Sequence, residues 1–185
     1  MEIIANARQA LMKAKSNEEE FGAFCSMIQH HGYPTPMLDW SKSPYVAAFF
    51  AYRTITREDL KKAELNAMVR IHVFEYVRWR ETFQQLPQML FPGLHVSLLE
   101  FVAVENERLI PQQGVSTMTN IDDIETYIRT REHETKAVYL SAYDLPVNEK
   151  NKVMNELSCM GITAGSLFPG LDGACEELRE RNFDV

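Results

Sequence analysis

Residues 29–40, QHHGYPTPMLDW, concentrate side chains that could do chemistry. Two adjacent histidines offer imidazole groups for acid–base or metal chemistry, while Asp39 and Trp40 offer a carboxylate and an aromatic wall for a ligand. Pro34 and Pro36 restrict the chain around them to extended conformations. This density of special residue types in a stiffened connection predicts a binding or catalytic site.

The run that follows, SKSPYVAAFFAY, is apolar on every side and predicts a buried helix. Ser43 can accept hydrogen bonds from free N–H groups at the helix start, and Pro44 suits the first turn. Because helix N-terminal amides attract phosphate or carboxylate, Ser41 and Ser43 are candidate contacts to a nucleotide phosphate. The alternative is that Asp39 and Ser43 only cap the helix while Trp40 fills the core.

The histidine pair supports one functional side chain at most. Adjacent residues of a helix point about 100° apart, so His30 and His31 cannot both face one small site, and His31 is the candidate. A metal centre needs several convergent ligands. The other histidines are scattered, and neither an HExxH motif nor a cysteine pair occurs, so we predict no metal site.

Hydrophobic periodicity predicts both helices and strands around these residues. The alternation in AMVRIHVFEY places Val69, Ile71 and Val73 on one face of a strand. Predicted strands cover 67–76, 98–105 and 136–143, and predicted helices cover 17–30, the run from Ser43, 121–129, 147–160 closed by Gly161, 172–181 and an N-terminal stretch with Ile3, Ala7 and Leu11. Because no regular strand–helix–strand rhythm appears, the predicted class is α+β, with a small mixed or antiparallel sheet flanked by helices.

The composition is that of an ordinary globular chain. Its 185 residues, 45% hydrophobic and 24% charged, predict a single domain over 1–185, with a helical extension at 1–19 and a core at 20–185. A formal charge of −7 without a dense basic run argues against a nucleic-acid partner. Three cysteines without metal-ligand spacing predict reduced, core-packed thiols in a cytoplasmic protein. No signal-peptide or membrane-spanning pattern occurs, so we expect no membrane partner.

Three blocks of the sequence resemble successive blocks of the FRG domain family. They are QHHGYPTPMLDWSKSPYVAAFFA, RLIPQQGVSTM at 108–118 and GITAGSLFPGLDGACEEL at 161–178. Their order and content match the family across most of the chain. The aromatic-Arg-Gly motif after which the family is named does not occur, which predicts either a truncated member or a first block supplied by another segment or chain.

A more distant resemblance is to ADP-ribosyltransferases, in which a Ser-Thr-Ser-like strand enters a helix and a glutamate precedes a Pro-Pro-Gly turn. DWSKSPYVAAFFA is similar to the former element, and ENERLIPQQGVSTM is similar to the latter. The resemblance implies Glu107 as the catalytic carboxylate that stabilises oxocarbenium charge on a ribose, with Glu105 assisting. The alternative is that both glutamates lie on the solvent face of a strand.

Two glycine-containing turns follow in the later blocks. In PQQG, the Gln113 amide both donates and accepts hydrogen bonds, so it can contact a ligand or bridge backbone segments. Gly114 is expected to meet a conformational need of the backbone. In LFPGLDG, Leu167, Phe168 and Leu171 are expected to close the core around a Pro-Gly turn.

The resemblances imply an ADP-ribosyltransferase-like enzyme of a bacterial conflict or toxin-type system that uses a nicotinamide dinucleotide, NAD, as its substrate and requires no other cofactor. A protein target is then an expected partner. The alternative is a non-catalytic module that binds a ligand or a protein segment without turnover. The expected dinucleotide contacts are His31, Asp39, Trp40, Ser41, Ser43 and Gln113.

Overall fold

The computed structural model describes residues 25, 28–29, 33–64, 66–86, 93–99 and 108–183. Helices and small antiparallel sheets make up this part of the chain, which confirms the α+β class. The chain divides into two compact units, and each is described by itself. The first unit comprises Met1–Trp40, Glu75–Asn106 and Val115–Tyr139, and the second comprises Ser41–Phe74, Glu107–Gly114 and Leu140–Val185.

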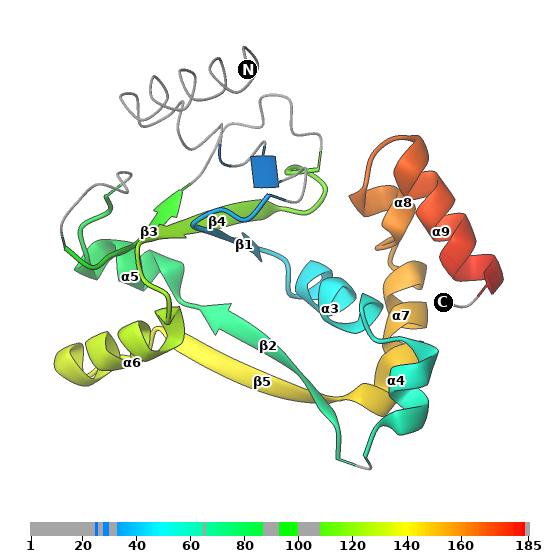
Figure 1. Cartoon of the computed structure of the whole chain (residues 1–185), viewed down its shortest axis with the longest axis horizontal. Helices are drawn as coiled ribbons and strands as arrows, with labels where there is room; N and C mark the ends of the chain where they lie inside the picture. The colour runs from blue at the N-terminus through cyan, green and yellow to red at the C-terminus, as the bar shows by residue number, and fades with distance from the viewer. Residues whose placement is uncertain are drawn as a thin grey trace, which may run out of the picture. The chain divides into compact units, whose positions relative to one another are not determined.

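A sheet of the order β1–β4–β3 forms the centre of the first unit (Figure 1). Its strands are β1 (Met37–Ser41), β3 (Val96–Leu99) and β4 (Gly114–Thr119). Strands β3 and β4 are antiparallel, with Val96 opposite Thr119. Strand β4 carries buried hydroxyl residues, and the sequence analysis predicted no strand there. Of the strand predicted at 98–105, only its first two residues fall in β3, and residues 100–105 lie outside the described residues.

Aromatic side chains pack in the first unit beside β3. Trp79 of α5 (Tyr76–Thr82) is 1% exposed, and its indole donates a hydrogen bond of 2.9 Å to the Val96 carbonyl. The rings of Phe83 and Tyr139 lie 4.2 and 5.2 Å from the Trp79 ring, between centroids. Buried aromatic pairs of this kind contribute beyond their area alone. These contacts fix α5 against the sheet.

Helix α6 (Ile124–Thr135) confirms a helix in the region predicted at 121–129, but it starts only at Ile124 and continues beyond residue 129. The Asp123 carboxylate accepts from the Thr126 amide at 2.9 Å, as a helix cap should. Lys136 then ends the helix in a left-handed conformation. The strand predicted at 136–143 therefore starts only at Leu140.

The second unit contains an antiparallel ribbon of β2 (Met68–Phe74) and β5 (Leu140–Pro146). Its register pairs Met68 with Pro146 and Phe74 with Leu140. The strand predicted at 67–76 is confirmed. Val73 is nevertheless exposed, although alternation places it on the same face as the half-buried Val69 and Ile71.

Helices pack together in the second unit. They are α3 (Pro44–Arg53), α4 (Arg57–Lys62), α7 (Lys150–Cys159), α8 (Ala164–Leu167) and α9 (Leu171–Phe183), with a 3₁₀ turn at Val147–Glu149. Val46 and Phe49 of α3 join Leu157 and Leu167 in one buried cluster. The prediction that α3 is buried all round is wrong, because Tyr45 remains 54% exposed on its uncovered side.

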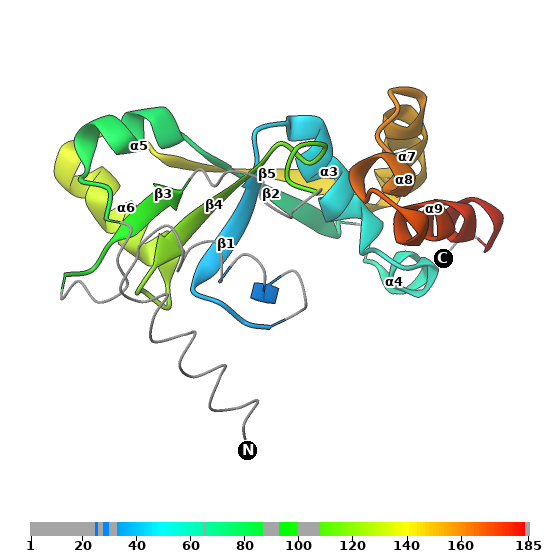
Figure 2. The same cartoon turned by 90° about the horizontal axis from the view of Figure 1, so that it is seen from above.

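Two glycines end or turn the chain near its C-terminal end. Gly161 follows α7 with φ of 79°, which confirms the predicted helix stop, and Gly170 turns the chain with φ of 94° between α8 and α9. These helices are drawn in orange to red in Figure 2. Leu167 is buried as expected, and Phe168 packs against the same core. Leu171 is 79% exposed, so its predicted core role is wrong: it opens α9 on a solvent-facing position.

The cysteines differ in burial. Cys25 is buried beside Met37 and Met118, and this burial raises the pKa of its thiol. Cys159 and Cys175 are exposed, so the prediction of core packing is wrong for both. Cys25, Ile28 and Gln29 are helical, as predicted for 17–30; the remainder of that helix and the predicted N-terminal helix lie outside the described residues.

Candidate functional site

Asp39 is an exposed carboxylate held in place by neutral hydrogen-bond donors. In β1 it accepts from the Gln29 amide at 2.7 Å and from the Ser116 hydroxyl of β4 at 2.9 Å. Thr35 in turn donates to the Gln29 amide oxygen at 2.5 Å, which orients that amide. Hydrogen bonds to a carboxylate fix its geometry, and neutral donors leave its negative charge uncompensated. The first unit thus presents an oriented anion at its surface.

Trp40 follows on the same strand and is half-buried. Its indole N–H donates to the Thr117 hydroxyl at 3.0 Å, and Thr117 is completely buried in β4. A tryptophan with its polar edge satisfied inside the protein can present the rest of its ring to a ligand or to the core. Successive strand residues point to opposite faces, so Asp39 and Trp40 serve different faces of the sheet.

Ser41 and Ser43 form a hydrogen-bonded junction at the start of α3 in the second unit. The Ser41 hydroxyl donates to the Gln112 carbonyl at 2.8 Å and accepts from the Ser43 amide at 3.1 Å. The buried Ser43 hydroxyl accepts from the Val46 amide at 3.3 Å, which confirms the predicted helix cap. Both hydroxyls have partners within the chain, and their contact with a ligand stays a prediction.

At the turn into β4, three successive residues have different structural roles: Gln112, Gln113 and Gly114. Gln113, whose side chain is exposed, has the left-handed backbone conformation, with φ of 49°, and its carbonyl accepts from the Lys42 amide at 3.0 Å. The Gln112 amide donates to the Leu167 carbonyl at 3.0 Å and bridges two segments. Gly114 has no positive φ; a Cβ there would lie 2.8 Å from the Leu109 side chain. Gly114 therefore leaves room for the Leu109 side chain, whereas the uncommon left-handed backbone conformation is that of Gln113.

Three predicted site residues lie outside the described residues: His31, Glu105 and Glu107. Of those described, Asp39 and Trp40 belong to the first unit, whereas Ser41, Ser43 and Gln113 belong to the second. The catalytic roles of the two glutamates stay predictions.

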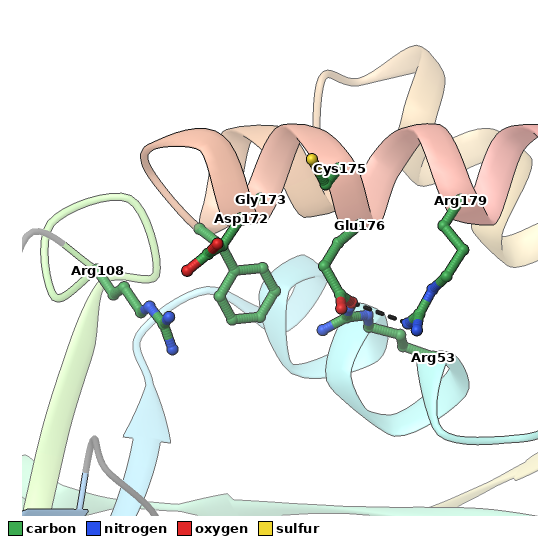
Figure 3. A pocket seen from close by; sticks show the side chains of 8 residues that line it. Arg53, Arg108, Asp172, Gly173, Cys175, Glu176 and Arg179 are labelled. Atoms are coloured by element: carbon green, nitrogen blue, oxygen red, sulfur yellow. Dashed lines mark hydrogen bonds and ion pairs between the residues drawn. The ribbon is translucent and has the colours of Figure 1, made fainter.

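The second unit also has a cavity whose charged residues the sequence analysis did not single out. Three arginines line it together with two carboxylates (Figure 3). Its volume is about 580 Å³. The arginines come from α3, from the turn before β4 and from α9. Charge of one sign gathered from separate segments has no periodic signal in a sequence, so only the folded chain reveals it. Its lining residues are Arg53, Arg108, Phe168, Asp172, Gly173, Cys175, Glu176 and Arg179.

Lys150 of α7 is a buried lysine of the second unit. Lys150, only 9% exposed, donates from its ammonium group to the Ile55 carbonyl just beyond α3. Burial lowers the pKa of Lys150, while the charges of Glu180 and Asp59 raise it. The contact satisfies a carbonyl after a helix end, so we assign Lys150 a structural role.

The described ranges contain neither a metal-ligand cluster nor a membrane-spanning helix. Within them, no three His, Cys, Asp or Glu side chains are placed to hold a metal ion. None of the helices described here is long and apolar enough to cross a membrane.

The fold and these contacts define the class of the protein. It is an α+β chain in which a proline-stiffened segment leads through a strand into a helix. Residues 1–60 match the family model of the FRG domain. The match includes QHHGYPTPMLDWSKSPYVAAFFA and confirms the family resemblance of that block. The resemblance of the blocks at 108–118 and 161–178 lies outside the matched residues and stays a prediction. No curated protein and no solved structure matches the chain.

Proposed function

We propose that this FRG-type chain binds a nicotinamide dinucleotide and transfers its ADP-ribose group, as an ADP-ribosyltransferase-like enzyme of a bacterial conflict or toxin-type system. Nicotinamide leaves with the electron pair of the glycosidic bond. A water molecule or a side chain of a protein target then forms the new bond to the ribose and loses a proton. The observation that supports this proposal most is the exposed and oriented Asp39 carboxylate.

Asp39 is suited to bind a ribose hydroxyl. Gln29 and Ser116 contact different oxygens of its carboxylate, so its plane is fixed before a ligand arrives. Each carboxylate oxygen has more than one acceptor site, so these bonds leave acceptor capacity for a hydroxyl donor. A fixed negative charge near a ribose also stabilises the positive charge that develops when the glycosidic bond breaks.

Glu107 is assigned the charge-stabilising role on the resemblance to ADP-ribosyltransferases alone, with Glu105 assisting. His31 is also assigned to the dinucleotide site. Trp40 is not, because it lies on the face of the sheet opposite Asp39 and its indole N–H donates to Thr117. Removal of a preorganised electrostatic contact to the transition state lowers turnover by about 100-fold to 1000-fold. A loss of turnover of this size is therefore expected when the charge of Glu107 is removed.

The test is nicotinamide release from NAD by the purified chain, followed by chromatography. We expect Glu107→Gln to release nicotinamide about 100-fold more slowly, because the amide keeps the shape of the carboxylate but not its charge. Glu58→Gln is the matched control, since Glu58 is a solvent-exposed glutamate of α4 that pairs with Lys62 across one helical turn. Equal rates in wild type and Glu107→Gln, or no release by wild type, would overturn the enzymatic proposal.

The second candidate function is a non-catalytic binding module. The hydrogen bonds of two hydroxyl groups favour this candidate. The Ser41 hydroxyl bonds the backbone of Gln112 and Ser43, and the Ser43 hydroxyl bonds the backbone of Val46. These are the contacts of a structural junction. This candidate predicts saturable binding of NAD in calorimetry with no nicotinamide released. Glu107→Gln would then still bind NAD saturably and release no nicotinamide.

A further inference from the structure

The cavity of the second unit has the chemistry of an anion site. Its lining holds three arginines against two carboxylates, in a chain whose formal charge is −7. A volume of about 580 Å³ lies in the range of small-molecule pockets. The lining thus gathers three guanidinium groups, each of which can donate hydrogen bonds to a small anion.

Two of the arginines lie against one aromatic ring. The guanidinium carbon of Arg53 is 4.8 Å from the centre of the Phe168 ring, and that of Arg108 is 5.2 Å from it. A guanidinium that contacts an aromatic ring is oriented while its N–H donors stay directed outward in their own plane. Phe168 itself packs against the core of the second unit, so it gives both cations a fixed support.

An internal carboxylate already bridges two of these cations. Glu176 forms an ion pair with Arg53 and a second one with Arg179 at 3.1 Å, and Figure 3 shows these three side chains together on the α9 side of the cavity. Arg53 also pairs with Glu180 at 2.6 Å, which holds it in place. The Glu176 oxygens therefore mark where an external anion would meet guanidinium donors. Glu176 competes with such an anion for the same donors.

We propose that this cavity binds a small phosphate-bearing molecule through Arg108, Arg53 and Arg179. A phosphate group presents three oxygens and up to two negative charges, so it can contact all three guanidinium groups, whereas the carboxylate of Glu176 contacts those of Arg53 and Arg179. The ligand lies over the Phe168 support and takes the donors of Arg179 from Glu176. Phosphate binding in this cavity is independent of the proposed ADP-ribosyl transfer.

Inorganic pyrophosphate is the probe, titrated into the full chain in a calorimeter at low ionic strength. We expect saturable binding by wild type and binding at least tenfold weaker in Arg108→Gln, since one guanidinium contact is lost. Glu176→Gln should bind severalfold more tightly, because the competing internal charge is gone. This gain is a result that simple damage to the fold would not produce.

Arg129→Gln is the matched control, because Arg129 is a half-exposed arginine of the first unit that pairs with Glu125 and Glu132 along α6. Its affinity for pyrophosphate should equal that of wild type. Thermal unfolding of each variant with and without pyrophosphate checks folding and binding together, since a ligand raises the melting temperature of a chain that binds it. Absence of saturable binding in wild type, or equal affinity in wild type and Arg108→Gln, would overturn the proposal.

Discussion

Carboxylates are held differently in the two units. In the first unit, Asp39 accepts from an amide and a hydroxyl, and both donors are neutral. In the second, Glu176 pairs with Arg53 and Arg179, and all three groups are charged. Neutral donors orient a carboxylate and leave its charge to act on a ligand, whereas paired arginines largely cancel it. The arrangement at Asp39 suits a site that needs a negative charge of its own. The arrangement around Glu176 suits a site that binds an anionic ligand.

The largest effect is expected from the core of the first unit. Trp79→Ala removes a buried indole, its hydrogen bond to Val96 and its ring contacts with Phe83 and Tyr139. We expect a loss of about 3–5 kcal/mol in the free energy of unfolding, measured by urea denaturation. As a control, Tyr143→Ala on the exposed face of β5 should change it by less than about 0.5 kcal/mol. A loss below about 1 kcal/mol for Trp79→Ala would contradict the described packing.

Gly173→Ala tests the support of the cavity in the second unit. A Cβ at this position in α9 would overlap the Phe168 carbonyl oxygen, so the backbone must shift. We expect about 1–3 kcal/mol of destabilisation in thermal or urea unfolding, together with weaker pyrophosphate binding. Ala174→Ser, on the exposed neighbour in α9, is the control. Unchanged stability and binding in Gly173→Ala would show that the first turn of α9 is not packed as described.

Ser43→Ala separates the cap of α3 from a ligand contact. The cap bond to the Val46 amide is lost, so the free energy of unfolding should fall by about 1 kcal/mol. Ser43→Thr keeps a hydroxyl that can cap and should recover part of the loss. If Ser43 acts only as a cap, NAD binding by the folded variant stays at the wild-type level in calorimetry. A tenfold loss of NAD affinity would instead assign Ser43 to the ligand.

The smallest effect is expected at the surface pair of the β2–β5 ribbon. The side-chain hydrogen bond from Arg70, followed by the charges of Arg70 and His72, lowers the pKa of Asp144. A depressed folded-state pKa contributes stability above the unfolded-state pKa, and the contribution is lost as the pH falls through the folded value. Arg70→Gln should raise the pKa of Asp144 towards its ordinary value in an NMR titration. The stability difference between variant and wild type should shrink below about pH 4, and a pKa of Asp144 that does not move would refute the pairing.

Local rules predicted much of the fold. Ser43 caps a helix and Gly161 ends one, because capping and positive φ depend on a few adjacent residues. Strand β4 was missed because Ser116 and Thr117 read as surface residues, yet the fold buries both and gives each a polar partner. Burial of this kind depends on distant segments, which short-range patterns do not encode.

The candidate sites show the same limit. Asp39 could be singled out from its motif, but its partner Ser116 lies 77 positions away along the chain. The cavity brings Arg53 and Arg108 from different segments onto Phe168. Arg53 stands in no motif that predicts binding, and Arg108 belongs to RLIPQQGVSTM but was assigned no role there. Residues that build a site from one segment are visible in a sequence; those that meet only after folding are not.

The proposed role of the Asp39 charge is tested most directly by the rate of nicotinamide release from NAD in Asp39→Asn. The amide keeps the size of the side chain and one acceptor oxygen but removes the negative charge. We predict a rate about 100-fold below wild type, with a free energy of unfolding within about 1 kcal/mol of wild type. A wild-type rate in this variant, or no release by wild type itself, would contradict the account.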